Sequence, residues 1–153
     1  MNLTFPGGSA RILGASAVAV NAPADTNENI LATITIPAGA MGLNGIIRFV
    51  SDISCTNNVN AKTMRLRFSG IGGTVLDTTN MASVGARTQS IMIFNRGVAN
   101  SQRVIYYTNN QTIYPTSSAV DTSVATTLVL TMVKATAGDT VTLESYLAEL
   151  ILP

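Results

Sequence analysis

Short segments in which apolar and polar residues alternate recur along the chain between Gly, Asn, Pro and Asp residues. The cleanest example is residues 63–68, where Met64, Leu66 and Phe68 fall on one side of an extended chain. A period of two is typical of a strand with one buried face. Turn residues at short intervals favour many short strands over long helices. No segment keeps a helical period long enough for a bundle, so we expect an all-β fold.

About eight strands are predicted between residues 30 and 152, a number and spacing typical of an antiparallel β-sandwich of the jelly-roll type. Residues 90–94 are apolar on both faces, as in a central sandwich strand, and Asn44-Gly45 predicts a turn because both residues tolerate positive φ. The predicted strands are 30–36, 46–55, 63–68, 74–76, 90–94, 104–107, 126–134 and 140–152.

The 153 residues suffice for one domain, and residues 1–29 differ from the rest, 30–153. Residues 11–20 are small and apolar, and residues 21–29 are polar. Two interpretations stay open: a first strand followed by a loop, or an extended arm that reaches a neighbouring subunit. Small side chains suit backbone pairing along the sheet edge of another chain. The apolar residues that would make such contacts are Ile12, Leu13, Val18 and Val20.

Charged residues make up only 11% of the chain, although 46% of it is hydrophobic. A soluble domain carries roughly 25% charged residues, so Thr, Ser and Asn must supply most of the polar surface here. Neutral polar groups are less costly than charges to bury beneath another protein. The composition therefore predicts a component of an assembly.

The net charge of +1 argues against partners that are strongly anionic, such as nucleic acid or a membrane surface. No apolar run approaches the ~20 residues of a membrane-spanning helix. Residues 1–8 lack the basic and apolar segments of a secretory signal, so synthesis in a reducing cytoplasm is expected.

Catalytic equipment is scarce. The chain has no histidine, which is the commonest general acid–base and a frequent metal ligand, and Cys55 is its single cysteine. Glu144 and Glu149 are predicted on opposite faces of one strand, which would not pair them for hydrolysis. We therefore expect no enzymatic activity, cofactor, metal site or small-molecule substrate.

Three arginines are candidates for a basic contact face. Arg65 and Arg67 share one face of their strand, and Arg48 is expected on a neighbouring strand. Such a face is either solvated or in contact with an acidic partner surface, since Arg is enriched at interfaces. Nucleic-acid contact is disfavoured because no aromatic side chain that could stack on bases lies nearby.

Three stretches together carry a resemblance: residues 35–45, TIPAGAMGLNG; residues 56–68, TNNVNAKTMRLRF; and residues 146–150, YLAEL. With this arrangement the chain resembles small virion structural proteins of tailed bacteriophages, in particular capsid decoration or cement proteins and related tail or fibre β-domains. The resemblance covers residues 30–152.

The resemblance implies a jelly-roll-like sandwich that oligomerises, as a dimer or trimer, and binds the major capsid protein. The protein would be made in the cytoplasm of the host bacterium. Its place would be the virion, on the outer surface of the head, where it would stabilise contacts between capsid subunits. The alternative is a receptor- or carbohydrate-binding tail or fibre domain. In that case Tyr106, Tyr107 and Tyr114 are the first candidates for stacking on a sugar.

Overall fold

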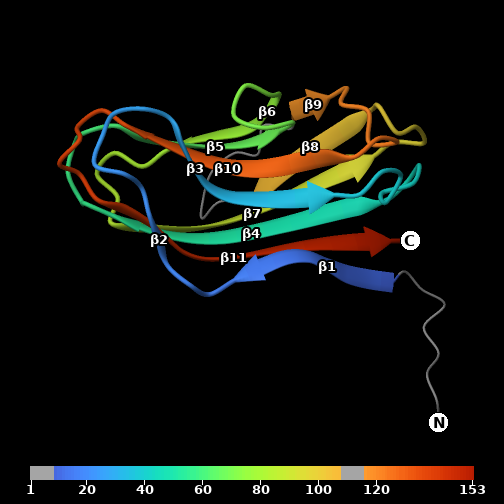
Figure 1. Ribbon diagram of the computed structural model, residues 1–153, viewed down its shortest axis with the longest axis horizontal. Coiled ribbons are helices and arrows are strands. Elements are labelled where there is room, and N and C mark those ends of the chain that lie inside the picture. Colours follow the sequence, from blue (N-terminus) through green and yellow to red (C-terminus); the bar gives the residue numbers. More distant parts are fainter. Residues whose placement is uncertain (1–8, 108–115) are drawn as a thin grey trace, which may run out of the picture.

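The computed structural model describes residues 9–107 and 116–153, which form a sandwich of two antiparallel sheets (Figure 1). No helix occurs within these ranges. The strands are β1 (Ser9–Ser16), β2 (Val20–Asn21), β3 (Asn29–Ile36), β4 (Ile46–Cys55), β5 (Lys62–Phe68), β6 (Val75–Asn80), β7 (Ala86–Asn95), β8 (Gln102–Tyr107), β9 (Thr116–Ser118), β10 (Thr126–Lys134) and β11 (Val141–Leu152).

The strand order identifies a jelly roll. One sheet has seven strands in the order β1-β11-β4-β7-β8-β9, with β2 also paired to β11, and the other has the order β3-β10-β5-β6. The pairs β1/β11, β3/β10, β4/β7 and β5/β6 are nested within one another along the chain. A long hairpin rolled into two sheets has this pairing, so the predicted fold class is confirmed.

Eleven strands are present in the described residues, where about eight were predicted. Each predicted segment forms a strand. β1 lies in residues 1–29, for which a first strand is one of the two interpretations, and β2 and β9 are additional. β9 consists of three polar residues, β2 has two residues, and β1 is broken by a bulge between Ile12 and Gly14. None of these three segments carries a sustained alternation, and backbone pairing with a neighbour holds them in place.

The core lies between the two sheets. Inward residues of β4 and β5, such as Phe49, Leu66 and Phe68, are completely buried. The ring of Phe49 stacks on Tyr146 of β11 with centroids 6.4 Å apart. The alternation read from the sequence therefore corresponds to the inner and outer faces of the sandwich.

The turn before β4 differs in detail from the one predicted. Positive φ occurs at Gly39 and Gly42, whereas Asn44 and Gly45 do not adopt it. Gly45 is needed for space: a Cβ atom there would lie 2.1 Å from the carbonyl oxygen of Met41, whose carbonyl accepts the Gly45 N–H. A close backbone approach, and not a left-handed conformation, explains this glycine.

The prediction that Glu144 and Glu149 lie on opposite faces of β11 is wrong. A bulge between Leu143 and Ser145 shifts the alternation. Glu144 accepts a hydrogen bond from Ser54, and Glu149 from Arg48. Ser54 and Arg48 are six residues apart on β4 and so share its outer face.

Truncation of the core tests the packing. Phe49→Ala is expected to lower the free energy of unfolding by about 3–5 kcal/mol, because Phe49 is fully buried and the neighbours cannot fill the cavity. Urea denaturation measures the change. The matched control is Val59→Ala, since Val59 is 82% exposed in a loop and its truncation should change stability by less than about 0.5 kcal/mol. Equal effects of the two substitutions would contradict the assignment of the core.

Candidate interaction surface

The outer face of the four-stranded sheet is lined by threonines. Outward positions of β3, β5, β6 and β10 form this threonine face, defined by Thr33, Thr35, Thr63, Thr78 and Thr127, all at least partly exposed. Neutral hydroxyls thus occupy positions where sandwiches often carry charges. The threonine face is thus one surface on which the low charge content of the chain is evident.

Arg65 and Arg67 project from the threonine face toward one carboxylate. Arg67 Nε and Nη2 donate to the two oxygens of Glu28 at 3.0 and 3.1 Å, and Arg65 Nη1 lies 3.2 Å from Glu28 Oε2. The buried Thr131 hydroxyl also donates to Glu28, at 2.6 Å. Glu28 precedes β3 and is distant from both arginines in the sequence, so the alternation of β5 did not show it.

The surroundings of Glu28 alter its acidity. Partial burial raises the pKa of the carboxyl, but the hydrogen bonds from Thr131 and Arg67, together with the charges of Arg67 and Arg65, outweigh that effect. The pKa of Glu28 therefore lies below its ordinary value. The carboxylate offsets one of the two arginine charges and joins the segment before β3 to β5 and β10.

Arg48 does not join this cluster, so the expectation of a basic face formed by three arginines is wrong. Arg48 belongs to β4 in the seven-stranded sheet, on the opposite side of the sandwich from β5. Its Nη2 lies 2.7 Å from Glu149 Oε2. The sequence could not reveal this separation, because alternation indicates which residues of a strand share a face but not which sheet the strand joins.

The outer face of the seven-stranded sheet is apolar. Residues that alternate with the buried ones on β4, β7, β8 and β11 are partly exposed and large. Cross-strand register places Ile46 between Ile151 and Phe94, and Met92 beside Ile105. This apolar face is defined by Ile46, Val50, Met92, Phe94, Ile105, Leu147 and Ile151, all partly exposed. The Arg48–Glu149 pair lies among them, and the exposed Arg103 of β8 lies opposite Phe94.

A signal for this face was present in the sequence. Residues 90–94 are apolar on both faces, which was interpreted as burial in the centre of the sandwich. In the structure Ile91 and Ile93 are buried, whereas Met92 and Phe94 remain partly exposed on the outer face. Contiguous apolar side chains that remain partly exposed are a feature of interaction sites in soluble proteins.

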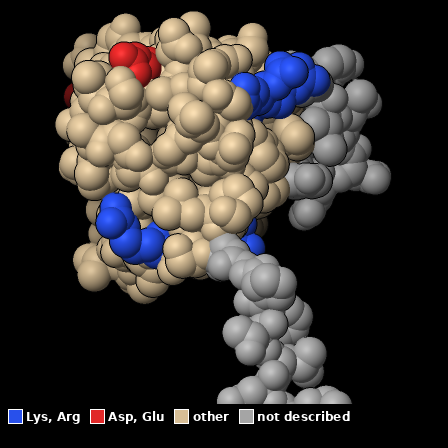
Figure 2. Space-filling view, turned by 90° about the vertical axis from the view of Figure 1, so that its right-hand side faces the viewer, with Lys and Arg blue, Asp and Glu red and all other residues tan. Residues whose placement is uncertain are grey.

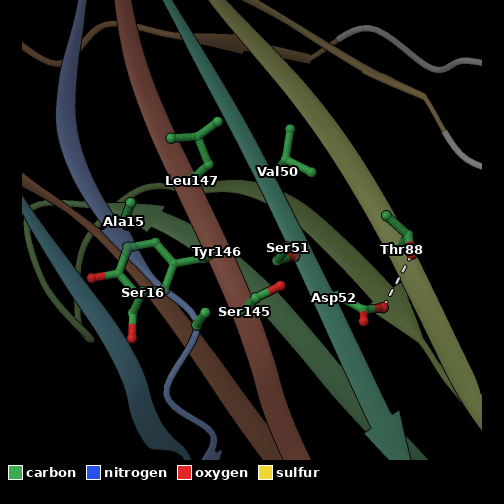
Figure 3. Close-up of a pocket in the computed structure, with 10 residues that line it drawn as sticks. Ala15, Ser16, Val50, Ser51, Asp52, Thr88, Ser145, Tyr146 and Leu147 are labelled. Carbon is green, nitrogen blue, oxygen red and sulfur yellow. Dashed lines mark hydrogen bonds between the residues drawn. The ribbon is translucent and has the colours of Figure 1, made fainter.

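An open groove of about 620 Å³ crosses one end of the apolar face (Figure 3). Val50 and Leu147 line it together with polar groups from Ser145, Asp52 and Thr88. The Thr88 hydroxyl donates to Asp52 Oδ1 at 3.1 Å. The groove thus offers a carboxylate and hydroxyls beside apolar walls.

The segment proposed as a strand or an arm lies beside the apolar face. Residues 9–16 form β1, which pairs antiparallel with β11 of the same chain and ends the sheet. Ile12, Val18 and Val20 are exposed, at 63%, 75% and 38%, while Leu13 packs against the core. Residues 1–8 lie outside the described residues.

Of the tyrosines considered for sugar stacking, Tyr106 is partly buried against the core. Tyr107 is the last residue of β8, and the structure describes its backbone only. Tyr114 belongs to residues 108–115, which lie outside the described residues. Among the residues that are described, no three His, Cys, Asp or Glu side chains gather as a metal site would require. The same residues include no helix long and apolar enough to cross a membrane.

Charged side chains are sparse elsewhere as well. Figure 2 shows the end of the sandwich at which β11 finishes, where neutral residues cover most of the described surface and charged residues form small separate groups. A surface of this kind presents little electrostatic barrier to close contact with another protein.

No protein-family model matches the chain, and no curated protein matches its sequence. Similar solved structures include lectin I from Ulex europaeus in complex with the methyl glycoside of α-L-fucose, at 10% identity over 97% of this chain and 94% of the lectin, with a TM-score of 0.44. A lectin from Bauhinia forficata in complex with GalNAc is 8% identical over 97% of this chain and 94% of the lectin, with a TM-score of 0.47. The VP2 protein of infectious bursal disease virus is 13% identical over 94% of this chain and 31% of VP2, with a TM-score of 0.42.

The Glu28 cluster generates a pH-dependent prediction. Glu28→Gln is expected to lower the free energy of unfolding at neutral pH by about 1–2 kcal/mol, because the charge-assisted hydrogen bonds from Arg67 and the ion pair with Arg65 are lost. The folded-state pKa is depressed, so the contribution of Glu28 is present above the unfolded-state value of about 4.3 and disappears as the pH falls through the folded-state value.

Urea unfolding of wild type and variant at about pH 7 and about pH 3 measures this difference, which should shrink at the lower pH. Glu149→Gln serves as the control, because its partner Arg48 is 45% exposed and the pair should contribute under about 1 kcal/mol. A Glu28→Gln deficit of equal size at both pH values would disprove the electrostatic explanation.

Proposed function

We propose that the protein is a non-enzymatic structural protein of a bacteriophage virion. In this role it binds the major capsid protein on the outer surface of the assembled head and stabilises contacts between capsid subunits. The supporting observation is the apolar face on the seven-stranded sheet of a jelly roll with very few charged residues. The phage context comes from the sequence resemblance over residues 30–152.

The apolar face has the composition of an interface core. Large side chains, among them Met92 and Phe94, lie side by side across β4, β7, β8 and β11. Aromatic, Met and Arg residues are the ones enriched in such cores. A specific contact covers roughly 800 Å² per partner, and apolar area contributes about 25 cal/mol per Å² before the costs of association.

The Arg48–Glu149 pair would orient the partner. The pair sits among apolar residues on the exposed face, with Arg48 45% exposed. When a partner covers it, the guanidinium needs further acceptors to offset its lost hydration. A partner surface that presents carbonyl or carboxylate oxygens at this point is favoured over one that does not.

The β1 edge offers a second mode of contact. β1 pairs only with β11 among the described strands, so its other edge exposes backbone donors and acceptors. Ile12 and Val18 are exposed next to that edge. A strand from another copy can add there, which supports a homo-oligomer, either a dimer or a trimer.

The groove of Figure 3 favours a second candidate, a receptor- or carbohydrate-binding tail or fibre domain. Asp52, Thr88 and Ser145 present a carboxylate and two hydroxyls at one place. Sugar hydroxyls are recognised by polar groups of this kind fixed in a concave site. This candidate predicts binding through the groove and not through the whole apolar face.

Binding to capsids tests the proposal. Purified protein added to capsids of the parent phage that lack it should co-sediment and saturate at a fixed stoichiometry. Met92→Asp should weaken binding about tenfold or more, because the contact would bury an unpaired carboxylate. Thr33→Asp on the threonine face is the matched control and should bind like wild type. Urea unfolding verifies that both variants fold.

Two results would overturn the capsid role. One is failure of the wild-type protein to bind such capsids. The other is retention of binding by Met92→Asp together with its loss in Thr33→Asp. Binding to host-cell glycans that Asp52→Ala abolishes would establish the second candidate instead.

A further inference from the structure

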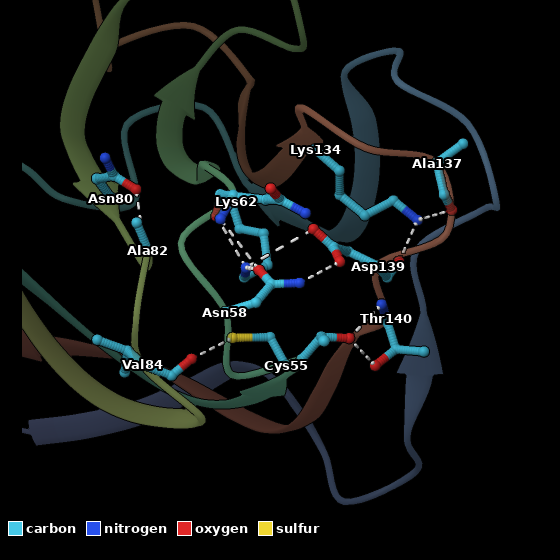
Figure 4. A network of polar contacts seen from close by, with 12 residues as sticks. Cys55, Asn58, Lys62, Asn80, Ala82, Val84, Lys134, Ala137, Asp139 and Thr140 are labelled. Atoms are coloured by element: carbon cyan, nitrogen blue, oxygen red, sulfur yellow. Dashed lines mark hydrogen bonds and ion pairs between the residues drawn. The ribbon is translucent and has the colours of Figure 1, made fainter.

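A buried polar cluster lies at the end of the sandwich where β4 finishes and β11 begins (Figure 4). The loops 56–61, 81–85 and 135–140 meet there. Ser83 N–H donates to the carbonyl of Asn58 at 2.6 Å, and Thr56 N–H donates to that of Thr140 at 3.0 Å. Lys62 is completely buried between these loops, and Asp139 is 6% exposed.

Lys62, Asn58 and Asp139 contact one another in a closed arrangement. Lys62 Nζ donates to Asn58 Oδ1 and to the carbonyl oxygen of Asn60, each at 2.8 Å, and Asn58 Nδ2 donates to Asp139 Oδ1 at 2.7 Å. The remaining oxygen, Asp139 Oδ2, lies 3.8 Å from Lys62 Nζ and accepts no hydrogen bond although it is buried. A buried acceptor without a hydrogen bond is costly in a purely structural cluster.

Each part of an acyl-transfer site is present. An amine lies against a side-chain carboxamide, and the carboxamide oxygen also accepts the backbone N–H of Asn60 at 3.1 Å, where charge would develop on attack. Asp139 contacts the carboxamide nitrogen, which would be the leaving group, and its free oxygen faces the amine. A carboxylate so placed can take a proton from one nitrogen and deliver it to the other.

We propose that Lys62 and Asn58 join spontaneously in an isopeptide bond, with Asp139 as the catalytic proton carrier. Asp139 Oδ2 accepts a proton from the Lys62 ammonium, and the neutral Nζ attacks Asn58 Cγ. The Asn60 N–H stabilises the resulting oxyanion. Asp139 then protonates Nδ2, and the Cγ–Nδ2 bond breaks to release ammonia. Nζ loses its second proton to this ammonia, which leaves as ammonium. The Nζ–Cγ bond replaces the Nδ2–Cγ bond, and no oxidant or other reactant is needed.

The ionisation of Asp139 agrees with its first task. The hydrogen bond from Asn58 lowers the pKa of Asp139, and desolvation raises it. The side chain of Asn60 and the charges of Lys62 and Lys134 act in the same direction as Asn58, so the pKa lies below its ordinary value. The group is therefore a carboxylate at neutral pH and is able to accept a proton. Burial of the site also excludes water, which would otherwise compete with the amine.

Lys134 provides a contrast within the same cluster. It is also buried, at 3% exposed, but its Nζ donates to backbone carbonyls, those of Asp139 at 2.8 Å and Ala137 at 3.4 Å. No carboxamide is among these partners. The chemistry is thus specific to Lys62, and it is independent of the function proposed above.

Mass spectrometry of the purified, folded full chain tests the proposal. The segment carrying both residues should be about 17 Da lighter than its sequence requires, the mass of one lost ammonia. Trypsin should fail to cleave after Lys62, giving a peptide of residues 49–65, and fragment ions from cleavage between Asn58 and Lys62 should be missing.

Three variants identify the bond. Lys62→Met and Asp139→Asn should have the full mass, whereas Lys134→Met, which removes the other buried lysine, should keep the loss. Wild-type protein with full mass and normal cleavage after Lys62 overturns the proposal, whether or not any variant folds. A loss of about 17 Da that persists in Lys62→Met would indicate a succinimide at Asn58-Val59 and would overturn it equally.

Discussion

Packing of two apolar inner faces against each other is the interaction on which the rest of the molecule depends. The chain has no disulfide within the described residues and little charge, so burial of residues such as Phe49, Leu66 and Phe68 supplies the main driving force. Because side chains alternate along a strand, fixing which residues point inward also fixes which point outward. Both candidate surfaces and the positions of the loops follow from this single constraint.

The two outward faces that result have opposite chemistry. The threonine face is polar, and its arginines are largely satisfied within the chain by Glu28. The apolar face carries large hydrophobic side chains together with the Arg48–Glu149 pair, and Arg103 of β8 lies opposite Phe94. An apolar outer face does not stabilise an isolated sandwich. It stabilises an assembly in which another protein covers that face. This asymmetry and the sparse charge of the sequence together support the proposed role in contact with other proteins.

Local pattern was sufficient to predict the strands that carry long alternations, among them 46–55, 63–68 and 126–134, and to predict the sandwich. Features that depend on contacts between distant segments were not predictable. Arg48 was assigned to the wrong surroundings because alternation does not report sheet membership. Glu28 reaches Arg67 across 39 positions, and Asp139 reaches Asn58 across 81, so neither cluster has a sequence signature. The bulge in β11 is visible only in the register of its pairing with β4, which the sequence does not give.

The pairing of β1 with β11 has a consequence for the order in which the molecule can form. Ser9 lies opposite Leu152, so these strands can meet only when almost the whole chain is available. The pairs β3/β10 and β4/β7 close progressively shorter loops inside that one. Closure of long loops is entropically unfavourable until shorter ones are in place, and topologies dominated by distant contacts fold slowly, over about milliseconds to seconds. The β5/β6 hairpin is therefore the natural starting point, and the edge that β1 completes is the last part of the seven-stranded sheet to become ordered.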